Sequence, residues 1–440
     1  MYKNTKKNIL HITPHLGGGV GTVLLNYLSF VKDNKNTIHS VATLDYANEK
    51  SIKRSQEAEF KLFPDMHKKV SDLLDLISES DIILIHFWNH PLLYDFLVRN
   101  ELPPSRIIFW SHVSGIVPPY IFPFKTLKYP DIFIFTTPLS FKAKEVENFP
   151  NKNHFRTIWS SGGVNNVKNA EKKPHKRFNI GYVGTVDYSK MHSEFLEICS
   201  QINIPDVKFI ICASDNYANI QAKAQKMGIA DKFEFLCQVP DTKDYLEIFD
   251  VFGYPLNPNH YGTCDQVLQE AMAAGVVPVV LNNPMESYMV SNGKVGLVAK
   301  NTKDYVSLIE KLYNEPELRA ELSKNAKEYA ISKYSVEILN KEWEQIFNEA
   351  LNLPKVKRKW DISKQNITYM DIFIESIGEY GINFKKEHIE EIEKMAKLPN
   401  WQSETKGTIH QYYKFFKDDK NIKYFSELMK YSEPTKYTIA

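Results

Sequence analysis

The chain has 440 residues, 43% of them hydrophobic, which is enough for two medium-sized domains with sizeable cores. Its formal charge of +2 creates no global field for a polyanion, so we expect no nucleic-acid partner. The four cysteines stand singly and form no C-x-x-C pair, which argues against a structural zinc site and a disulfide framework. The basic N-terminus lacks an apolar signal core, and no run of about 20 uncharged apolar residues occurs. We therefore expect a cytoplasmic protein.

The first third of the chain alternates short apolar strands with helical segments. A glycine-rich loop, Leu16–Thr22, separates the first strand from a helix that begins near Val23, and another helix is predicted over His90–Arg99. This alternation predicts a parallel, doubly wound sheet. The predicted strands are Asn8–Thr13, Ile38–Leu44, Ile82–Phe87, Arg106–Trp110, Ile132–Thr136 and Phe155–Trp159.

The same pattern restarts after a polar, basic segment, Asn165–Arg177, which contains a proline and is typical of a linker. Two doubly wound units place a ligand cleft at the carboxyl ends of their strands. The chain therefore predicts an α/β protein of two domains. The strands expected in the second domain are Asn179–Val183, Val207–Cys212, Lys232–Leu236, Val251–Leu256 and Val277–Leu281.

Three helices, Thr302–Asn314, Pro316–Tyr334 and Val336–Ala350, are expected to close the second half. The amino-acid composition changes beyond Leu353, where Lys, Glu, Tyr and Phe are frequent and no motif is recognisable. We expect a mostly helical extension there, available for oligomer contacts. The predicted boundaries are 1–164 for the first domain, 165–178 for the linker, 179–335 for the second domain, 336–353 for a closing helix and 354–440 for the extension.

The most informative stretch is His260–Val280, which reads HYGTCDQVLQEAMAAGVVPVV. A predicted strand is followed by a loop rich in Asn, Pro and Gly, and the loop by a predicted helix. The free backbone N–H groups at the start of such a helix can bind an anion. Asp265 stands at the expected helix start, where its side chain is suited to capping. One turn further along the helix, Glu270 adds a carboxylate. The stretch therefore predicts a site for a phosphorylated, sugar-bearing ligand.

Residues Glu270–Val279, EAMAAGVVPV, resemble the donor-binding segment of retaining glycosyltransferases of the GT-B fold, the "glycosyltransferase group one" family (family four). The resemblance covers roughly residues 5–350 and implies two Rossmann-like domains facing across a cleft. The family usually carries a first acidic residue eight positions before this glutamate, and Gly262 stands there. Asp265 is the candidate replacement, and a plain helix cap is the alternative.

The resemblance also implies the donor contacts. Lys190 would grip the diphosphate, although Thr185 stands where the family has an arginine. Glu270 would accept hydrogen bonds from the ribose, and the backbone of Val239 would contact the base. For Lys190 and Val239 the alternatives are a solvated lysine and an ordinary strand-to-helix turn. The implied donor-binding residues are Gly18, Gly19, Gly184, Lys190, Val239, Gln266, Val267 and Glu270, with Asp265 and His112 as catalytic candidates.

In the first domain, Gly18 and Gly19 belong to a loop that resembles the family's glycine loop over the donor phosphates, and a simple tight turn is the alternative. His112 directly follows a buried-type strand. By resemblance it would face the cleft near the transferred sugar, and a histidine satisfied by neighbouring backbone is the alternative.

The function implied is a retaining hexosyltransferase that moves a sugar from a nucleotide-sugar donor to a saccharide or lipid-linked acceptor in surface glycan synthesis. No Asp-x-Asp motif occurs, so neither a metal nor another cofactor is expected. The basic-aromatic stretches Pro123–Tyr129 and Lys355–Trp360 suggest peripheral contact with an anionic membrane, with solvated loop charge as the alternative. Two functional alternatives remain open: a non-catalytic GT-B subunit that binds a partner, and a GT-B nucleotide-sugar epimerase.

Overall fold

Two compact units make up the protein. The computed structural model describes residues 6–213, 217–237, 239, 241–260, 262–402, 404 and 406–430. Unit 1 combines residues 6–160 with residues 339–430, and unit 2 holds residues 161–338. Unit 1 is therefore discontinuous in sequence, because the chain completes unit 2 before it returns to finish unit 1.

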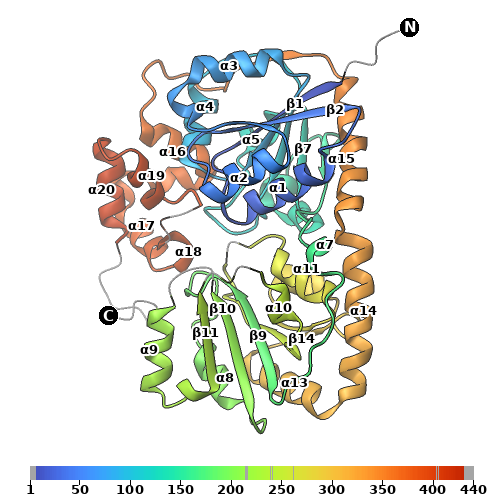
Figure 1. The fold of residues 1–440 in the computed structure, drawn as a ribbon. Coiled ribbons are helices and arrows are strands. Elements are labelled where there is room, and N and C mark those ends of the chain that lie inside the picture. The colour runs from blue at the N-terminus through green and yellow to red at the C-terminus, as the bar shows by residue number, and fades with distance from the viewer. Residues whose placement is uncertain are drawn as a thin grey trace. The chain divides into compact units, whose positions relative to one another are not determined.

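Unit 1 is built on a seven-stranded parallel sheet with the spatial order β3-β2-β1-β4-β6-β7-β8 (Figure 1). Its central strands are almost continuous apolar runs, as expected for a parallel sheet covered on both faces. The order reverses between β1 and β4, and such a switch point places a crevice at the carboxyl edge. The strands are β1 (Lys7–Thr13), β2 (Thr37–Thr43), β3 (Lys61–Phe63), β4 (Ile82–Phe87), β6 (Ile107–Ser111), β7 (Ile132–Phe135) and β8 (Phe155–Thr157).

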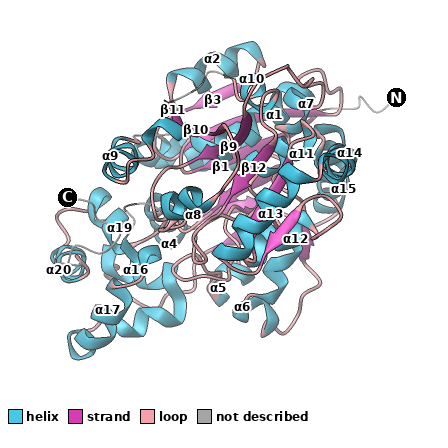
Figure 2. Ribbon diagram, turned by 90° about the horizontal axis from the view of Figure 1, so that it is seen from below, coloured by secondary structure: helices cyan, strands magenta, loops and turns pink. Residues whose placement is uncertain are grey.

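Helices cover the strands of this sheet (Figure 2). On one face, Leu24 and Leu28 pack in the same core cluster as Trp343 and Phe347, which belong to the last long helix before the C-terminal segment. This cluster joins the two sequence pieces of unit 1. The helices are α1 (Gly18–Val31), α2 (Glu49–Glu57), α3 (Val70–Glu79), α4 (Pro91–Arg99), α5 (Phe124–Lys128), α6 (Lys144–Glu147) and α15 (Val336–Leu351), the last of which lies in unit 1 from residue 339 onward.

Unit 2 repeats the design with a six-stranded parallel sheet in the order β11-β10-β9-β12-β13-β14. Its switch point lies between β9 and β12, whose carboxyl ends carry the loops discussed below. The strands are β9 (Phe178–Gly184), β10 (Val207–Ala213), β11 (Phe233–Cys237), β12 (Val251–Tyr254), β13 (Val277–Leu281) and β14 (Leu297–Ala299). The helices are α7 (Val164–Val167), α8 (Phe195–Gln201), α9 (Ala218–Lys226), α10 (Lys243–Leu246), α11 (Gln266–Ala273), α12 (Pro284–Val290), α13 (Thr302–Asn314) and α14 (Pro316–Tyr334).

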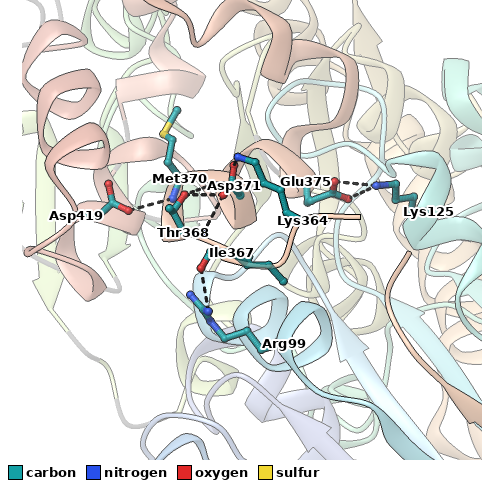
Figure 3. Close-up of polar contacts among 9 residues, drawn as sticks. All are labelled: Arg99, Lys125, Lys364, Ile367, Thr368, Met370, Asp371, Glu375 and Asp419. Carbon is teal, nitrogen blue, oxygen red and sulfur yellow. Dashed lines mark hydrogen bonds and ion pairs between the residues drawn. The ribbon is translucent and has the colours of Figure 1, made fainter. Parts of the chain in front are cut away.

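The C-terminal segment is helical, as predicted, and packs onto unit 1. Its short strand β15 (Val356–Arg358) pairs antiparallel with β5 (Leu102–Ser105). Polar contacts fix the helices that follow: Arg99 donates to the carbonyl oxygen of Ile367, and Lys125 pairs with Glu375 at 2.8 Å (Figure 3). The helices are α16 (Tyr369–Ile377), α17 (Ile389–Ala396), α18 (Pro399–Gln402), α19 (Ile409–Phe415) and α20 (Lys420–Leu428).

The basic run Lys355–Trp360, which the sequence suggests for membrane contact, is engaged within unit 1. Arg358 forms an ion pair with Asp131, and Lys357 pairs with Glu101 at 3.0 Å. Trp360 is buried. No helix among the described residues combines the length and the apolar character that a membrane-spanning segment requires.

The longer elements lie where the sequence predicts them. Strand β13 and helices α13 and α14 match their predicted bounds. Four strands were not predicted: β3, β5, β14 and β15. Each is three or four residues long, too short for an alternating or continuous apolar pattern to stand out.

Trp360 should contribute strongly to the stability of unit 1. Its indole Nε1 donates to Glu375 Oε2 at 2.9 Å, and its ring lies 5.8 Å from that of Tyr94 and 5.3 Å from that of Tyr129. Replacement by alanine should lower the free energy of unfolding of unit 1 by about 3–5 kcal/mol, because it leaves a cavity and removes one hydrogen bond of the Glu375 carboxylate. Chemical denaturation measures the change.

The matched control is Leu398→Ala in the same C-terminal segment, since Leu398 is 43% exposed. It should change the free energy of unfolding by no more than about 0.5 kcal/mol. Equal effects of the two substitutions would show that the C-terminal segment is not part of the cooperative core of unit 1.

Candidate functional site

In unit 2, the loops that follow β9 and β12 are tied together at the carboxyl edge of the sheet. The backbone N–H of Asn257 donates to the carbonyl oxygen of Lys190 at 2.8 Å, and the Asn257 side chain donates to the carbonyl oxygen of Tyr188 at 2.7 Å. An antiparallel bridge joins Met191 to Leu256. These bonds fix the backbone at Lys190 against the start of the loop that leads to α11.

These hydrogen bonds place the Lys190 side chain next to that of Asp265. Lys190 Nζ lies 3.0 Å from Asp265 Oδ1, and the side chains are 12% and 7% exposed. The ammonium group also lies 5.5 Å from the ring centroid of Tyr254, at the end of β12, a cation–π distance. Two residues 75 positions apart, both predicted as site residues, thus form one buried ion pair.

His260 and Glu286 complete a group that we call the carboxylate cluster, made of Lys190, His260, Asp265 and Glu286. His260 Nε2 lies 3.2 Å from the Glu286 carboxylate, and both side chains are almost fully buried. One ligand atom each of His260, Asp265 and Glu286 lies within 4.8 Å of the others, an arrangement that can hold a metal ion. The Lys190 ammonium already supplies positive charge there, so a metal ion would have to compete with it.

Within the carboxylate cluster, each charged group stabilises the charged form of a neighbour of opposite charge. Burial would raise the pKa of Asp265, but the positive charges of Lys190 and His260 outweigh it and hold this pKa below its usual value. Burial would lower the pKa of His260, yet the Glu286 carboxylate raises it above the ordinary histidine value. Asp265 is therefore a carboxylate at neutral pH, and His260 is poised to carry a proton.

Asp265 occupies the N-cap position of α11, but its side chain makes no capping hydrogen bond. The helix-cap alternative for this carboxylate is therefore wrong, since the side chain turns to Lys190 instead. A Cβ built on Gly262 would lie 3.1 Å from Asp265 Oδ1 and 2.7 Å from the His260 ring. The Asp265 carboxylate thus lies beside the place where a side chain at position 262 would begin.

Glu270 lies one turn further along α11. Its carboxylate packs over Gly163, where a Cβ would stand only 2.1 Å from Glu270 Oε1. Burial, with a smaller contribution from Asp241, raises the pKa of Glu270 to about 7. The glycine therefore makes room for a carboxyl group that is about half protonated at neutral pH.

The remaining predicted residues of unit 2 lie at the same edge of the sheet. Gly184 ends β9 with a positive φ of 144°, which favours glycine. Gln266 and Val267 are the first two residues of α11 and are partly exposed. Val239 follows β11, the edge strand, and is partly exposed, while its neighbours at 238 and 240 lie outside the described residues.

In unit 1, the predicted residues lie at the carboxyl ends of β1 and β6. Gly18 and Gly19 are exposed and open α1, with Gly18 at a positive φ of 60°. His112 follows β6 directly and is 6% exposed. The Trp88 ring, just after β4, lies 6.2 Å from the His112 ring and 5.3 Å from the His15 ring, which belongs to the loop after β1.

His112 is the end of a hydrogen-bonded series of buried imidazoles that we call the histidine chain: His39, His11, His86 and His112. His112 Nε2 lies 3.1 Å from His86 Nδ1, and His86 Nε2 lies 3.1 Å from His11 Nδ1. His11 Nε2 lies 2.9 Å from His39 Nδ1. Burial lowers the pKa of every ring. The alternative for His112 is that neighbouring backbone groups form its hydrogen bonds. This alternative does not account for His112 Nε2, because its partner is the His86 side chain.

The C-terminal segment reaches this edge of unit 1. Lys406 Nζ lies 5.6 Å from the Trp88 ring centroid, and the Phe415 ring lies 5.1 Å from the His90 ring. Gly407 is required there, because a Cβ would stand 2.0 Å from the carbonyl oxygen of Asn89. The segment without recognisable motifs therefore contributes side chains close to His112.

Comparison with known proteins fits this geometry. Residues 164–329, which lie within unit 2, match the family described as "Glycosyl transferases group 1". The capsular polysaccharide biosynthesis glycosyltransferase CapM of Staphylococcus aureus is 26% identical over 191 residues, which make up 41% of this chain and 50% of CapM. The chain therefore matches about half the length of that relative.

Solved glycosyltransferases share the fold of both units. The glycosyltransferase from Rickettsia africae ESF-5 superposes with a TM-score of 0.65 and 12% identity, over 79% of this chain and 99% of its own. Anabaena Alr3699/HepE, in complex with UDP, superposes with a TM-score of 0.63 and 14% identity, over 78% of this chain and 100% of its own. The predicted GT-B fold is confirmed, and the residues that match group 1 glycosyl transferases lie within its second unit.

Sequence reasoning missed several residues of these sites. The sequence does not single out Glu286, His260 or Gly163 as site residues. His11, His39 and His86 carry a usable signal, because each is a titratable residue inside a predicted strand of the parallel sheet. A polar residue on a strand buried on both faces requires a partner, and here the partners are one another.

Glu270 should make stability depend on pH. Its raised pKa of about 7 means that the native protein keeps a proton that the unfolded chain releases above its value of 4.5. This stabilising contribution is complete below the unfolded pKa and is lost as pH rises through the native one. The difference in unfolding free energy between wild type and Glu270→Gln should therefore fall by about 3 kcal/mol from acid to weakly alkaline pH. Denaturation curves across that range measure it, and a constant difference would contradict the raised pKa.

Proposed function

We propose that this protein is a retaining, metal-independent glycosyltransferase that transfers a sugar from a nucleotide-sugar donor to a saccharide or lipid-linked saccharide acceptor. The observation that carries the proposal is the convergence of Lys190, Asp265, Glu270 and the start of α11 at the carboxyl edge of a group 1 glycosyl transferase domain. The complexes of Alr3699/HepE with UDP and with UDP-glucose support a nucleotide-sugar donor. The role of CapM in capsular polysaccharide biosynthesis supports a surface-glycan acceptor.

The donor nucleotide would bind unit 2. Lys190 and the backbone N–H groups at Gln266 and Val267 suit the diphosphate, because they combine a cation with the positive end of a helix dipole. Gly184 lets the backbone approach the ligand closely. Glu270 would accept hydrogen bonds from the ribose hydroxyls, and Val239 would meet the base.

Asp265 would act on the sugar. Without a donor, Lys190 and Asp265 neutralise each other at 3.0 Å. A diphosphate offers Lys190 a stronger anionic partner, and the Asp265 carboxylate is then released to face the transferred sugar. Because Asp265 Oδ1 lies beside the side-chain position of Gly262, it replaces the first acidic residue of the family from three positions further along the chain.

The chemistry would proceed by a front-face route with retention. The bond from the anomeric carbon to the diphosphate oxygen breaks while the acceptor oxygen attacks from the same face. The leaving diphosphate accepts the acceptor's proton. Lys190 and the α11 N-terminus stabilise the negative charge on the leaving group, and Asp265 stabilises the positive charge that develops on the sugar. These charges come from the chain itself, so the proposal needs no metal ion.

Unit 1 would bind the acceptor. The exposed glycines Gly18 and Gly19 open α1, and His112 lies at the carboxyl end of β6. Lys406 adds a positive charge near the Trp88 ring. This set of groups suits a hydroxylated acceptor that carries an anionic group.

Glu270→Gln should weaken donor binding more than it slows turnover. Glu270 is proposed to hold the ribose in both the ground and the transition state, and loss of such uniform binding raises the Michaelis constant. Hydrogen bonds to a charged group contribute about 1.5–3 kcal/mol, so the donor should bind roughly tenfold more weakly or worse. Calorimetry with the nucleoside diphosphate measures this, and unchanged affinity would remove Glu270 from the donor site.

Asp265→Asn should slow turnover more than it weakens donor binding. Turnover on the full donor should fall at least about a hundredfold, because the carboxylate is needed only as charge develops. Affinity for the nucleoside diphosphate alone should stay the same or rise slightly, since Lys190 loses a competing anion. The fold should survive, because the Asp265 side chain caps no helix and asparagine keeps a hydrogen bond to Lys190.

The two substitutions control each other, since both remove one carboxylate from the same helix start. Near-normal turnover in Asp265→Asn would exclude Asp265 from the chemistry. A wild-type protein that binds nucleotides but transfers and hydrolyses nothing would favour a non-catalytic subunit. Conversion of the donor alone into its epimer would favour an epimerase.

A further inference from the structure

The histidine chain crosses unit 1 along one direction of the sheet. Its rings come from β2, β1, β4 and the residue after β6, four neighbouring positions in the strand order. Beyond His39, the series ends on Thr37, whose hydroxyl lies 3.0 Å from His39 Nε2. The chain thus connects the start of β2 with the carboxyl end of β6 through the interior of the unit.

Every link in the chain has the same orientation. Nδ1 of His39 meets Nε2 of His11, Nδ1 of His11 meets Nε2 of His86, and Nδ1 of His86 meets Nε2 of His112. A neutral imidazole has one N–H donor and one acceptor nitrogen. A link is satisfied only when one nitrogen brings the proton and the other brings the lone pair.

This orientation couples the tautomers of the four rings. If His39 carries its proton on Nδ1, each following ring must accept at Nε2 and therefore carry its own proton on Nδ1. If His112 carries its proton on Nε2, each preceding ring must do the same. Only these two arrangements satisfy all three links. The Thr37 hydroxyl serves both, because it donates in the first and accepts in the second.

Burial keeps the chain neutral. His11 and His86 are fully buried, and His39 and His112 are 8% and 6% exposed. A protonated imidazole has two donors and no acceptor, so the rings on its two sides would have to take opposite tautomers. One tautomer shared by all four rings therefore requires every ring to be neutral. Burial lowers the pKa of all four rings, in agreement with this requirement.

We propose that His86, His11 and His39 are positioning residues that couple the tautomer of His112 to their own through this chain, with the Thr37 hydroxyl as its terminal partner. His112 Nδ1 is the ring nitrogen that the chain does not use, so the chain decides whether His112 offers a donor or an acceptor there. A change at His112 alone would set two donors or two lone pairs against each other at the link to His86. The role at the acceptor site rests on the proposed glycosyl transfer, whereas the coupling of the tautomers does not.

Nitrogen-15 spectra of histidine-labelled protein test the coupling directly, because the two ring nitrogens have distinct shifts in each tautomer. The protein has 13 histidines, and single substitutions assign the four that matter. In the wild type, all four rings should be neutral at neutral pH and should share one tautomer. A mixture of tautomers within the chain, or a protonated ring, would overturn the proposal without any variant.

His39→Phe tests transmission. Phenylalanine fills the volume of the ring but removes the link to His11 and the connection to Thr37. The balance between the two arrangements then depends on three rings instead of four, so the tautomer ratio of the distant His112 should change. The control is His154→Phe, since His154 is a histidine of unit 1 that bonds the carbonyl oxygen of Leu127 outside the chain. An unchanged His112 spectrum in a folded His39→Phe protein would overturn the proposal.

Transfer kinetics test the consequence. A changed tautomer ratio alters the fraction of productive enzyme, so kcat/KM for the acceptor should change by about two- to tenfold in His39→Phe. Nucleoside diphosphate affinity should not change, and His154→Phe should leave both values unchanged. If the wild type transfers no sugar, the proposed function fails, while the spectra still decide the coupling. Shifted tautomers with unchanged acceptor kinetics would remove the positioning role.

Discussion

The ammonium group of Lys190 and the carboxylate of Asp265 must neutralise each other, because both are withdrawn from water at the edge of the unit 2 sheet. An isolated buried charge is costly, and a pair is tolerated only where its geometry is well fixed. The bonds from Asn257 to the Lys190 segment provide that geometry. The start of α11, the loop before it and His260 with Glu286 are all arranged around this pair.

Unit 1 must also satisfy polar side chains that are withdrawn from water, but it does so without an ion pair. The histidine chain is a buried polar group made of imidazoles, and their low pKa values keep them neutral. Neutral groups have no charge to balance, but each still needs one donor and one acceptor in its surroundings. The strands of a parallel sheet supply such partners at a regular spacing, so a histidine on one strand is satisfied by a histidine on the next.

Much of this architecture follows from sequence. The apolar runs of β4 and β13 and the periodic patterns of α13 and α14 gave the doubly wound units, because long elements repeat their pattern often enough to be recognised. The pairing of Lys190 with Asp265 did not follow, since it depends on two loops that meet only after the sheet has formed. The same holds for Gly163, whose lack of a side chain matters only because Glu270 lies against it. The C-terminal segment gave no functional signal, because its contacts with Trp88 and His90 arise from packing alone.

The discontinuity of unit 1 has a consequence for its synthesis on the ribosome. The first 160 residues emerge without Trp343, Phe347 and Trp360, which complete their core. Translation adds about 5–20 residues per second, so these side chains follow only after roughly 10–40 seconds. During that interval unit 2 emerges whole, while the apolar face that α15 covers stays open to solvent. All residues of unit 2 are therefore synthesised before unit 1 has received the side chains that complete its core.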